Sequence, residues 1–281
     1  MAADWHGKYI NLDRCRDRRG RMDRIVSEAG LGSKIRRHAA AEPSVGIGHM
    51  PASVLGCLRS HVDVVRSFAD VDKHLLVLED DVFLAPGFLR GVQVCSEHLE
   101  THAIDIMFLG QTIPYDAIGL HAELLGLLAR LRATARRGDS FAYLDCRRAY
   151  RYGCFAYMIN RKSLAKVDAL LQEGGDDTSL RPIDKLYAAL LAGRKLTGNV
   201  VFPYLVGLDA ALESTMKGRS LAEEHAAHAR LVNIYVDGAP VEDRRDSLEA
   251  NIKSISNAET IFLADELLRR LLAPRGAGGA R

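Results

Sequence analysis

The sequence lacks an apolar run long enough to cross a membrane, a Cys-x-x-Cys pair and a marked excess of either charge. Its 281 residues include 38 Lys and Arg against 36 Asp and Glu, so the chain as a whole has little attraction for nucleic acid. The five cysteines are scattered along the chain at Cys15, Cys57, Cys95, Cys146 and Cys154. Their odd number and their spacing argue against a zinc site or a disulfide framework and favour reduced thiols.

The first residues also lack an apolar core of secretory length, so we expect a cytoplasmic protein whose contact with a membrane, if any, is peripheral. Aromatic residues make up only 6%, but the 48% hydrophobic and 26% charged fractions are those of an ordinary globular protein. A chain of this length can bury a substantial core.

Short apolar runs alternate with stretches of helical spacing, which predicts an α/β fold. We expect strands at 9–12, 34–39, 75–78, 104–109, 152–159 and 196–202. The first helix is expected to end near Ala29, and further helices are expected at 52–69, 86–101, 121–137, 162–171 and 183–191. The predicted organisation is a main domain at 1–219, a helical C-terminal extension at 220–273 and a disordered tail at 274–281.

The most informative segment is the apolar run Leu75–Leu78, which leads directly into Glu79, Asp80 and Asp81 (the acidic segment). Three adjacent carboxylates repel one another unless a positive group lies between them. A divalent cation such as Mn²⁺ or Mg²⁺ accepts carboxylate oxygens and can hold a diphosphate. The alternative is a charged, solvated turn without a ligand.

Six short blocks follow one another in an order that resembles glycosyltransferase family 25, the lipooligosaccharide and collagen-type galactosyltransferases. The resemblance covers roughly residues 8–217 and rests on Tyr9–Arg14 with Asp17–Arg19, Leu55–His61, Leu78–Val82, Gly153–Tyr157, Pro182–Asp184 and Pro203–Thr215. It implies a GT-A type, Rossmann-like domain with a mixed central sheet. It also implies inverting transfer of a hexose, usually galactose from UDP-galactose, with Mn²⁺ as cofactor.

Under this resemblance Glu79 and Asp81 are the metal ligands, with Asp81 in direct contact, and Asp80 faces the sugar hydroxyls or the water around the metal. The predicted donor-binding residues are Asn11, Leu12, Arg14, Arg18, Ser60, His61, Asp80, Glu213 and Ser214. Arginines suit the diphosphate, although Arg19 is better explained as a solvated helix start. The pair Glu213 and Ser214 has an alternative explanation as a helix N-terminus.

An inverting transfer needs a base to remove the acceptor's proton, and Asp184 is the candidate. The alternative is that Asp184 only stabilises the start of a helix, where the helix dipole favours a negative charge. Asp176 and Asp177 compete with it, but Gly174 and Gly175 predict an exposed loop there. A hydrolase pair at Ser60 and His61 is excluded, because adjacent helical residues point about 100° apart.

The acceptor is expected to be a saccharide, such as the core of a lipooligosaccharide or lipopolysaccharide, extended at the cytoplasmic membrane face. The arginine-bearing helix at 121–137 and the apolar C-terminal helix could contact anionic lipid, although packing against the domain explains the first of them better. Two other functions stay open: a metal-dependent phosphohydrolase acting on a nucleotide sugar, and a non-catalytic nucleotide-sugar-binding protein.

Overall fold

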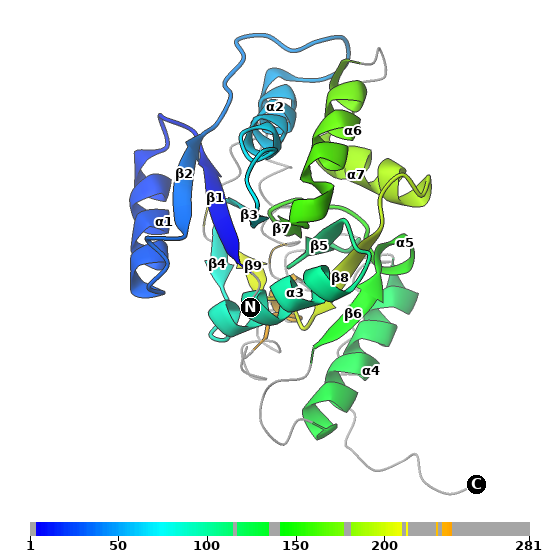
Figure 1. Cartoon of the computed structure of the whole chain (residues 1–281). Coiled ribbons are helices and arrows are strands. Elements are labelled where there is room, and N and C mark those ends of the chain that lie inside the picture. The colour runs from blue at the N-terminus through cyan, green and yellow to red at the C-terminus, as the bar shows by residue number, and fades with distance from the viewer. Residues whose placement is uncertain are drawn as a thin grey trace, which may run out of the picture.

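The computed structural model describes residues 4–114, 117–134, 141–176, 181–209, 212, 229 and 232–237, and these form an α/β domain around a mixed seven-stranded sheet (Figure 1). The strand order is β2-β1-β3-β7-β5-β8-β6. Strands β1, β2 and β3 are parallel, β7 runs antiparallel to β3 and β5, and β8 is parallel to β5. The predicted α/β class with a single Rossmann-like domain and a mixed sheet is confirmed.

The strands of the sheet are short and the central ones are fully buried. Their bounds are β1 Trp5–Asn11, β2 Ile35–Ala39, β3 His74–Glu79, β5 Ile106–Phe108, β6 Ala142–Asp145, β7 Ala156–Ile159 and β8 Gly198–Phe202. Burial on both faces explains why β3 and β7 read as continuous apolar runs rather than as alternating ones. The edge strand β6 is only half-buried, so its sequence gave no such signal and it was not predicted.

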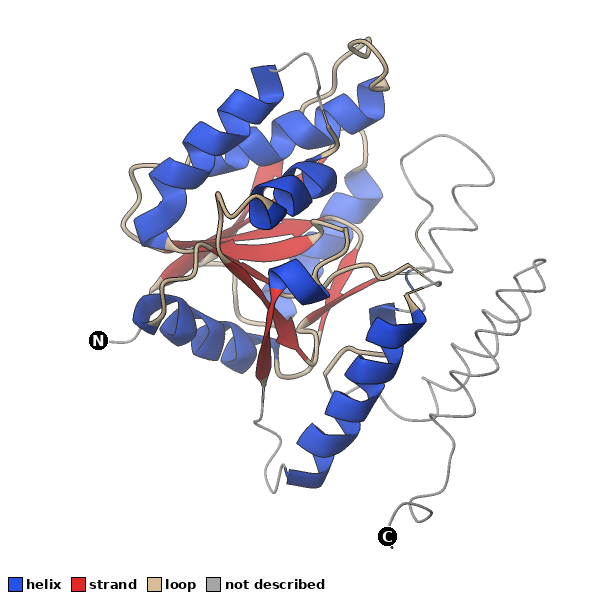
Figure 2. Cartoon of the chain, turned by 90° about the vertical axis from the view of Figure 1, so that its right-hand side faces the viewer, coloured by secondary structure: helices blue, strands red, loops and turns tan. Residues whose placement is uncertain are grey.

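Helices cover both faces of the sheet (Figures 1 and 2). Their bounds are α1 Arg16–Glu28, α2 Ala52–Arg66, α3 Phe88–Thr101, α4 Ile118–Thr134, α5 Cys146–Ala149, α6 Leu164–Asp176 and α7 Ile183–Ala192, with a 3-10 turn at Arg161–Ser163. Helices α2, α6 and α7 pack together on one face, and α3 lies on the other. Gly30, with φ +69°, ends α1 as predicted.

Two glycines explain where the predicted boundaries were wrong. The strand expected from residue 152 begins only at Ala156, because Gly153 has φ +90° and turns the chain. The loop expected at Gly174 is instead the last turn of α6, which continues to Asp176. A Cβ on Gly174 would lie 2.6 Å from Leu186, so this glycine allows α6 and α7 to approach closely.

The arginine-bearing helix α4 packs its leucines into the protein. Leu124 is fully buried and Leu128 nearly so, which agrees with the packing interpretation of this helix. Arg130 lies exposed near its end, while Arg136 and Arg137 fall outside the described residues. Within the described part of the chain, no helix combines the length and the apolar character that crossing a membrane requires.

A two-stranded ribbon, β4 (Val82–Leu84) with β9 (Val206–Leu208), stands beside the acidic segment that ends β3. Behind it, residues 232–237 pack on the main domain: the Tyr204 N–H donates to the Tyr235 carbonyl at 2.8 Å, and Val236 pairs with Tyr204. The buried Tyr235 ring contacts those of Phe202 and Tyr204. This part of the predicted extension therefore completes the core. Most of 220–273 and all of 274–281 lie outside the described residues.

Candidate active site at the carboxyl ends of β1 and β3

The carboxyl ends of two parallel strands bring Asn11 beside the acidic segment. Ile10 of β1 is in register with Glu79 of β3, so the next residues of the two strands lie side by side. The Asn11 amide donates to Asp80 Oδ2 at 2.7 Å and to the Cys15 carbonyl at 3.1 Å. This edge is where open α/β sheets bind ligands.

Arg18, in the first turns of α1, holds the same carboxylate. Its guanidinium donates to Asp80 Oδ1 at 2.8 Å and lies 3.8 Å from Asp81 Oδ2. All three side chains are about 11% exposed, so the pairing takes place largely away from water. Asp80 thus has one oxygen on Arg18 and the other on Asn11, which separates it from its two acidic neighbours.

Asp81 is buried, and its carboxyl is hard to ionise. Burial raises its pKa from 3.8 to about 7, with the negative charges of Glu79 and Asp80 adding to the effect and Arg18 opposing it. Its backbone carbonyl accepts a 2.7 Å hydrogen bond from the N–H of Asp209, which follows β9. A positive charge at this place would favour the ionised form of Asp81 and so offset both the burial and the neighbouring negative charges.

Two charged groups at this edge were missed by the sequence analysis. Arg37 of β2 donates to both Asn11 oxygens at 3.0 Å and pairs with Asp13. Arg21 of α1 pairs with Asp209 at 2.7 Å. The signal for Asp209 was its place directly after a strand, as for Glu79, but the short β9 was not predicted.

Ser60 is buried in α2, and its hydroxyl is occupied by the protein. It donates to the Gly56 carbonyl at 2.6 Å and accepts from the Ala41 N–H at 2.8 Å. It therefore fastens the loop after β2 to α2, and Gly56 lets the two segments meet closely, because a Cβ there would lie 2.7 Å from the Ala41 carbonyl. Its assigned donor role stays a prediction.

His61, one residue later on α2, faces the acidic segment. Its Nε2 lies 3.4 Å from Glu79 Oε1, and its Nδ1 is 2.9 Å from the hydroxyl of Tyr157 in β7. The rings of His61 and Tyr157 are stacked. Cys57, one helical turn before His61, was not singled out in the sequence, although its thiol lies close to both His61 and Glu79.

Asp184 is half-buried in the first turn of α7, where its Oδ1 accepts a 2.8 Å hydrogen bond from the Lys185 N–H. Burial raises the pKa of the Cys57 thiol well above its usual value, and the negative charges of Glu79, Asp184 and Asp81 raise it further. Asp184 therefore acts electrostatically on the same thiol as Glu79 and Asp81.

The remaining predicted donor residues fall at the rim or outside the described part. Leu12 is half-buried, and its carbonyl accepts from the Cys15 N–H at 2.9 Å. The half-exposed Arg14 pairs with Glu42 of the loop before α2. Glu213 and Ser214 lie outside the described residues. For all the predicted site residues, the assigned roles stay predictions.

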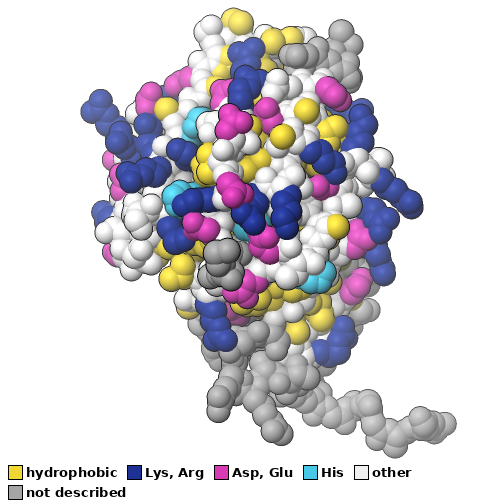
Figure 3. Space-filling view, in the orientation of Figure 1, with side chains coloured by type: hydrophobic (Ala, Val, Ile, Leu, Met, Phe, Trp, Pro, Cys, Tyr) yellow, Lys and Arg dark blue, Asp and Glu magenta, His cyan; other side chains and the backbone are white. Residues whose placement is uncertain are grey.

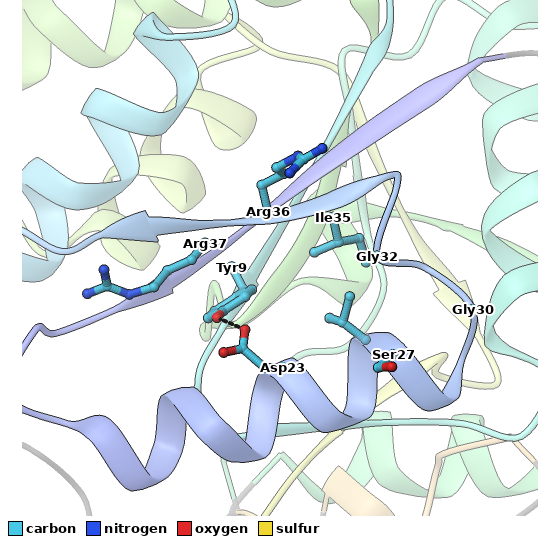
Figure 4. Close-up of a pocket in the computed structure, with 9 residues that line it drawn as sticks. Tyr9, Asp23, Ser27, Gly30, Gly32, Ile35, Arg36 and Arg37 are labelled. Atoms are coloured by element: carbon cyan, nitrogen blue, oxygen red, sulfur yellow. Dashed lines mark hydrogen bonds between the residues drawn. The ribbon is translucent and has the colours of Figure 1, made fainter.

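A separate hollow of about 460 Å³ lies between α1 and β2 (Figure 4). The Tyr9 hydroxyl donates to Asp23 inside it, and Ser27, Gly30 and Arg36 also line it. None of Glu79, Asp80, Asp81 and Asp184 lines this hollow, so it is not the acidic site. Burial and the Asp23 carboxylate raise the pKa of Tyr9, which leaves the phenol neutral.

The surface seen in Figure 3 carries basic and acidic side chains side by side, with hydrophobic atoms between them. Exposed large apolar side chains among the described residues include Val45 and Ile47 of the loop before α2. That loop joins β2 to α2 and is anchored by Ser60.

Comparison with known proteins gives one family. Residues 47–176 match the model of "Glycosyltransferase family 25 (LPS biosynthesis protein)". The matched range includes Cys57, Ser60, His61 and the acidic segment, and it stops before Asp184. No curated protein matches the chain. This match confirms, over residues 47–176, the resemblance to glycosyltransferase family 25 that the sequence motifs indicated.

Proposed function

We propose that this chain is a glycosyltransferase of family 25, and that it is a metal-dependent, inverting hexosyltransferase that moves galactose from UDP-galactose to a saccharide such as a lipopolysaccharide core. Enzymatic glycosyl transfer follows from the family. The observation that carries the metal-dependent form is the buried Asp81, whose carboxyl has its pKa raised to about 7 by burial and by the charges of Glu79 and Asp80. A buried carboxyl of this kind is typical of a site that completes its charge balance with a bound group.

The donor set fits a hard divalent cation such as Mn²⁺ or Mg²⁺. Glu79 and Asp81 supply carboxylate oxygens, and Asp80 is turned to Arg18 and Asn11. When bound, the cation supplies Lewis-acid stabilisation of the diphosphate that leaves the sugar. Arg18 adds a fixed positive charge beside the same carboxylates, and its pairing with Asp80 keeps it in place before the donor arrives.

The nucleoside end of the donor is assigned to the carboxyl end of β1. Asn11 is held by contacts to Asp80, Cys15 and Arg37, so its backbone and the neighbouring Leu12 are presented in a fixed geometry. Ser60 contributes indirectly, because it anchors Ala41 in the loop after β2, and the preceding Ala40 N–H donates to the Asn11 carbonyl at 3.0 Å. We assign Ser60 as a positioning residue and Arg14 as a rim contact to the ribose and diphosphate. Glu213 and Ser214, which lie outside the described residues, keep their predicted role in donor binding.

Asp184 is assigned as the base. Its carboxylate comes from the first turn of α7, a different element from the one that carries Glu79, so the base and the metal ligands are held independently. It removes the proton from the acceptor hydroxyl as that oxygen bonds to the sugar carbon and the bond to the diphosphate breaks. The N–H of Lys185 holds one carboxylate oxygen, which leaves the other to accept the proton.

The acceptor and the place of action belong to this proposal as well: a lipid-linked saccharide at the cytoplasmic face of the membrane, reached without a spanning helix. The family description names lipopolysaccharide biosynthesis, which supports such an acceptor. Because Leu124 and Leu128 of α4 are buried and Leu127 and Leu131 pack partly buried against the core, contact with lipid would involve the exposed basic end of this helix rather than its apolar stripe.

The test is transfer from a panel of nucleotide sugars to truncated core saccharides, in EDTA and with added Mn²⁺. We expect the highest rate with UDP-galactose and Mn²⁺. Asp184→Asn is expected to lower kcat by about 10²–10⁴ with little change in the KM for donor. Asp81→Asn is expected to lower activity by a similar factor through loss of the metal.

Asp63→Asn, an exposed carboxylate on α2, is the matched control and is expected to keep wild-type rates. Transfer that proceeds equally well in EDTA, or that Asp184→Asn leaves intact, contradicts the proposal. Release of free sugar from UDP-sugar at a rate that no acceptor alters would favour the phosphohydrolase alternative.

A further inference from the structure

Three different metal-ligating side chains from two elements meet beside the acidic segment. Cys57 and His61 are one turn apart on α2, so they project from the same face of the helix. Glu79 reaches them from the end of β3. One ligand atom from each of the three residues lies within 4.8 Å of the other two.

We propose that Cys57, His61 and Glu79 form a second cation site, which shares Glu79 with the carboxylate site of the proposed function and takes a thiol-binding divalent ion of the Zn²⁺ class. A thiolate, an imidazole and a carboxylate are the donors that zinc combines, and three protein ligands leave a fourth position for water. Mn²⁺ and Mg²⁺ prefer oxygen ligands, so they have little affinity for this set.

The distances suit the ion. Two ligands of a tetrahedral zinc lie roughly 3.4 Å apart when their bonds are about 2.0–2.1 Å long. His61 Nε2 and Glu79 Oε1 are 3.4 Å apart, so these two ligands already have the separation needed. The Cys57 Sγ, the third ligand, lies within 4.8 Å of a ligand atom of each of the other two residues.

Tyr157 supplies the outer contact that metal-bound histidines require. Its hydroxyl is 2.9 Å from His61 Nδ1, and the two stacked, buried rings fix the plane of the imidazole. With Nδ1–H donating to the tyrosine oxygen, Nε2 presents its lone pair toward Glu79. Without the ion, the tyrosine donates instead and Nε2–H faces the Glu79 carboxylate, so both states are satisfied.

The local charge favours a cation as well. Glu79, Asp184 and Asp81 all direct negative charge at Cys57. Binding releases the Cys57 proton to solvent and forms the metal–sulfur bond, so one proton leaves per ion bound. The sequence did not predict this site because Glu79 lies on another element and no Cys-x-x-Cys pair marks it.

Cobalt binding tests the site without substrate, so its outcome is independent of the proposed function. Metal-free, reduced protein is titrated with Co²⁺ in the absence of oxygen. We expect a near-ultraviolet thiolate-to-cobalt absorption band that saturates at one ion per chain and that Zn²⁺ abolishes. Cys57→Ser is expected to lose the band, whereas Cys95→Ala, which removes a buried thiol from α3, keeps it.

Tyr157→Phe is expected to weaken Co²⁺ binding about 10-fold or more, as loss of an outer contact to a histidine ligand does. The absence of the band in wild-type protein, or its survival in Cys57→Ser, overturns the proposal. If circular dichroism shows that Cys57→Ser does not fold, alkylation of wild-type protein decides. Zn²⁺ should then slow the alkylation of Cys57 and leave the alkylation of the similarly half-buried Cys15 unchanged. Equal labelling of Cys57 with and without Zn²⁺ overturns the proposal.

Discussion

Asn11 donates a 2.7 Å hydrogen bond to Asp80, and this bond joins the carboxyl ends of two neighbouring parallel strands through their side chains. With Arg18 on the other oxygen of the same carboxylate, both oxygens of Asp80 are hydrogen-bonded to the protein. Glu79 and Asp81 on either side of it are then the members assigned to a cation. The middle acid of the three is therefore bonded to Arg18 and Asn11, and the two outer acids are the ones assigned to the cation.

The Arg18–Asp80 pair is expected to be strongly coupled. Arg18→Ala leaves a largely buried carboxylate with Asn11 alone and is expected to destabilise the protein by about 3 kcal/mol or more. Asp80→Ala should cost a comparable amount, and the double variant should cost much less than the sum. Urea unfolding of the wild type, the two single variants and the double variant measures the coupling free energy between Arg18 and Asp80.

Arg19→Ala supplies the control, because the neighbouring Arg19–Asp23 pair is exposed and 3.9 Å apart. It is expected to change the free energy of unfolding by only about 0.5 kcal/mol. Equal losses for Arg18→Ala and Arg19→Ala would show that burial does not strengthen the Asp80 pair.

Asp81 is expected to make stability depend on pH. Its folded-state pKa of about 7 lies above the ordinary value of 3.8, so the native state binds the proton more tightly than the unfolded chain does. Wild-type stability in EDTA should therefore fall as pH rises from the ordinary value through about 7. Asp81→Asn removes this loss, so at pH 8 it should unfold at a higher temperature than wild type.

The advantage of Asp81→Asn should disappear well below the ordinary pKa of 3.8, at about pH 2, where the wild-type carboxyl is protonated in both states. Thermal unfolding across this pH range provides the measurement, and its size is on the order of a few kcal/mol, since each pKa unit corresponds to about 1.4 kcal/mol. A difference between the two proteins that stays constant with pH would contradict the assignment. Mn²⁺ should stabilise the wild type and leave the variant unchanged.

Ser60→Ala should loosen the loop that borders the donor pocket. The substitution leaves the Ala41 N–H without its 2.8 Å acceptor, which is expected to cost about 1–2 kcal/mol and to raise the KM for donor more than it lowers kcat. Ser67→Ala is the matched control, since that hydroxyl donates only to the Val64 carbonyl of its own helix. A change in kcat alone would argue against a positioning role.

Sequence patterns predicted the parts of the fold that local burial determines. The apolar runs around Leu75–Leu78 and 156–159 marked central strands, and the acids after Glu79 marked the candidate site. The short strands β4, β6 and β9 were missed, since each is only three or four residues long and is stabilised by its partner strand. Pairings such as Arg37 with Asn11 depend on the order of strands in the sheet, which no single segment encodes.

Tyr235 is expected to be essential to the core, although the sequence placed it in a separate extension. Its ring is buried against Phe202 and Tyr204, and its hydroxyl is 2.7 Å from His121 Nδ1 of α4. Tyr235→Ala should therefore destabilise the whole domain by about 3–5 kcal/mol, as loss of a buried aromatic ring does. Tyr235→Phe keeps the ring and should cost only about 1–2 kcal/mol for the lost hydrogen bond. Both are measured by urea unfolding followed at the far-ultraviolet helix signal. A separable extension predicts the opposite: Tyr235→Ala would leave the main transition unchanged, and the boundary at residue 219 would then divide two independent units.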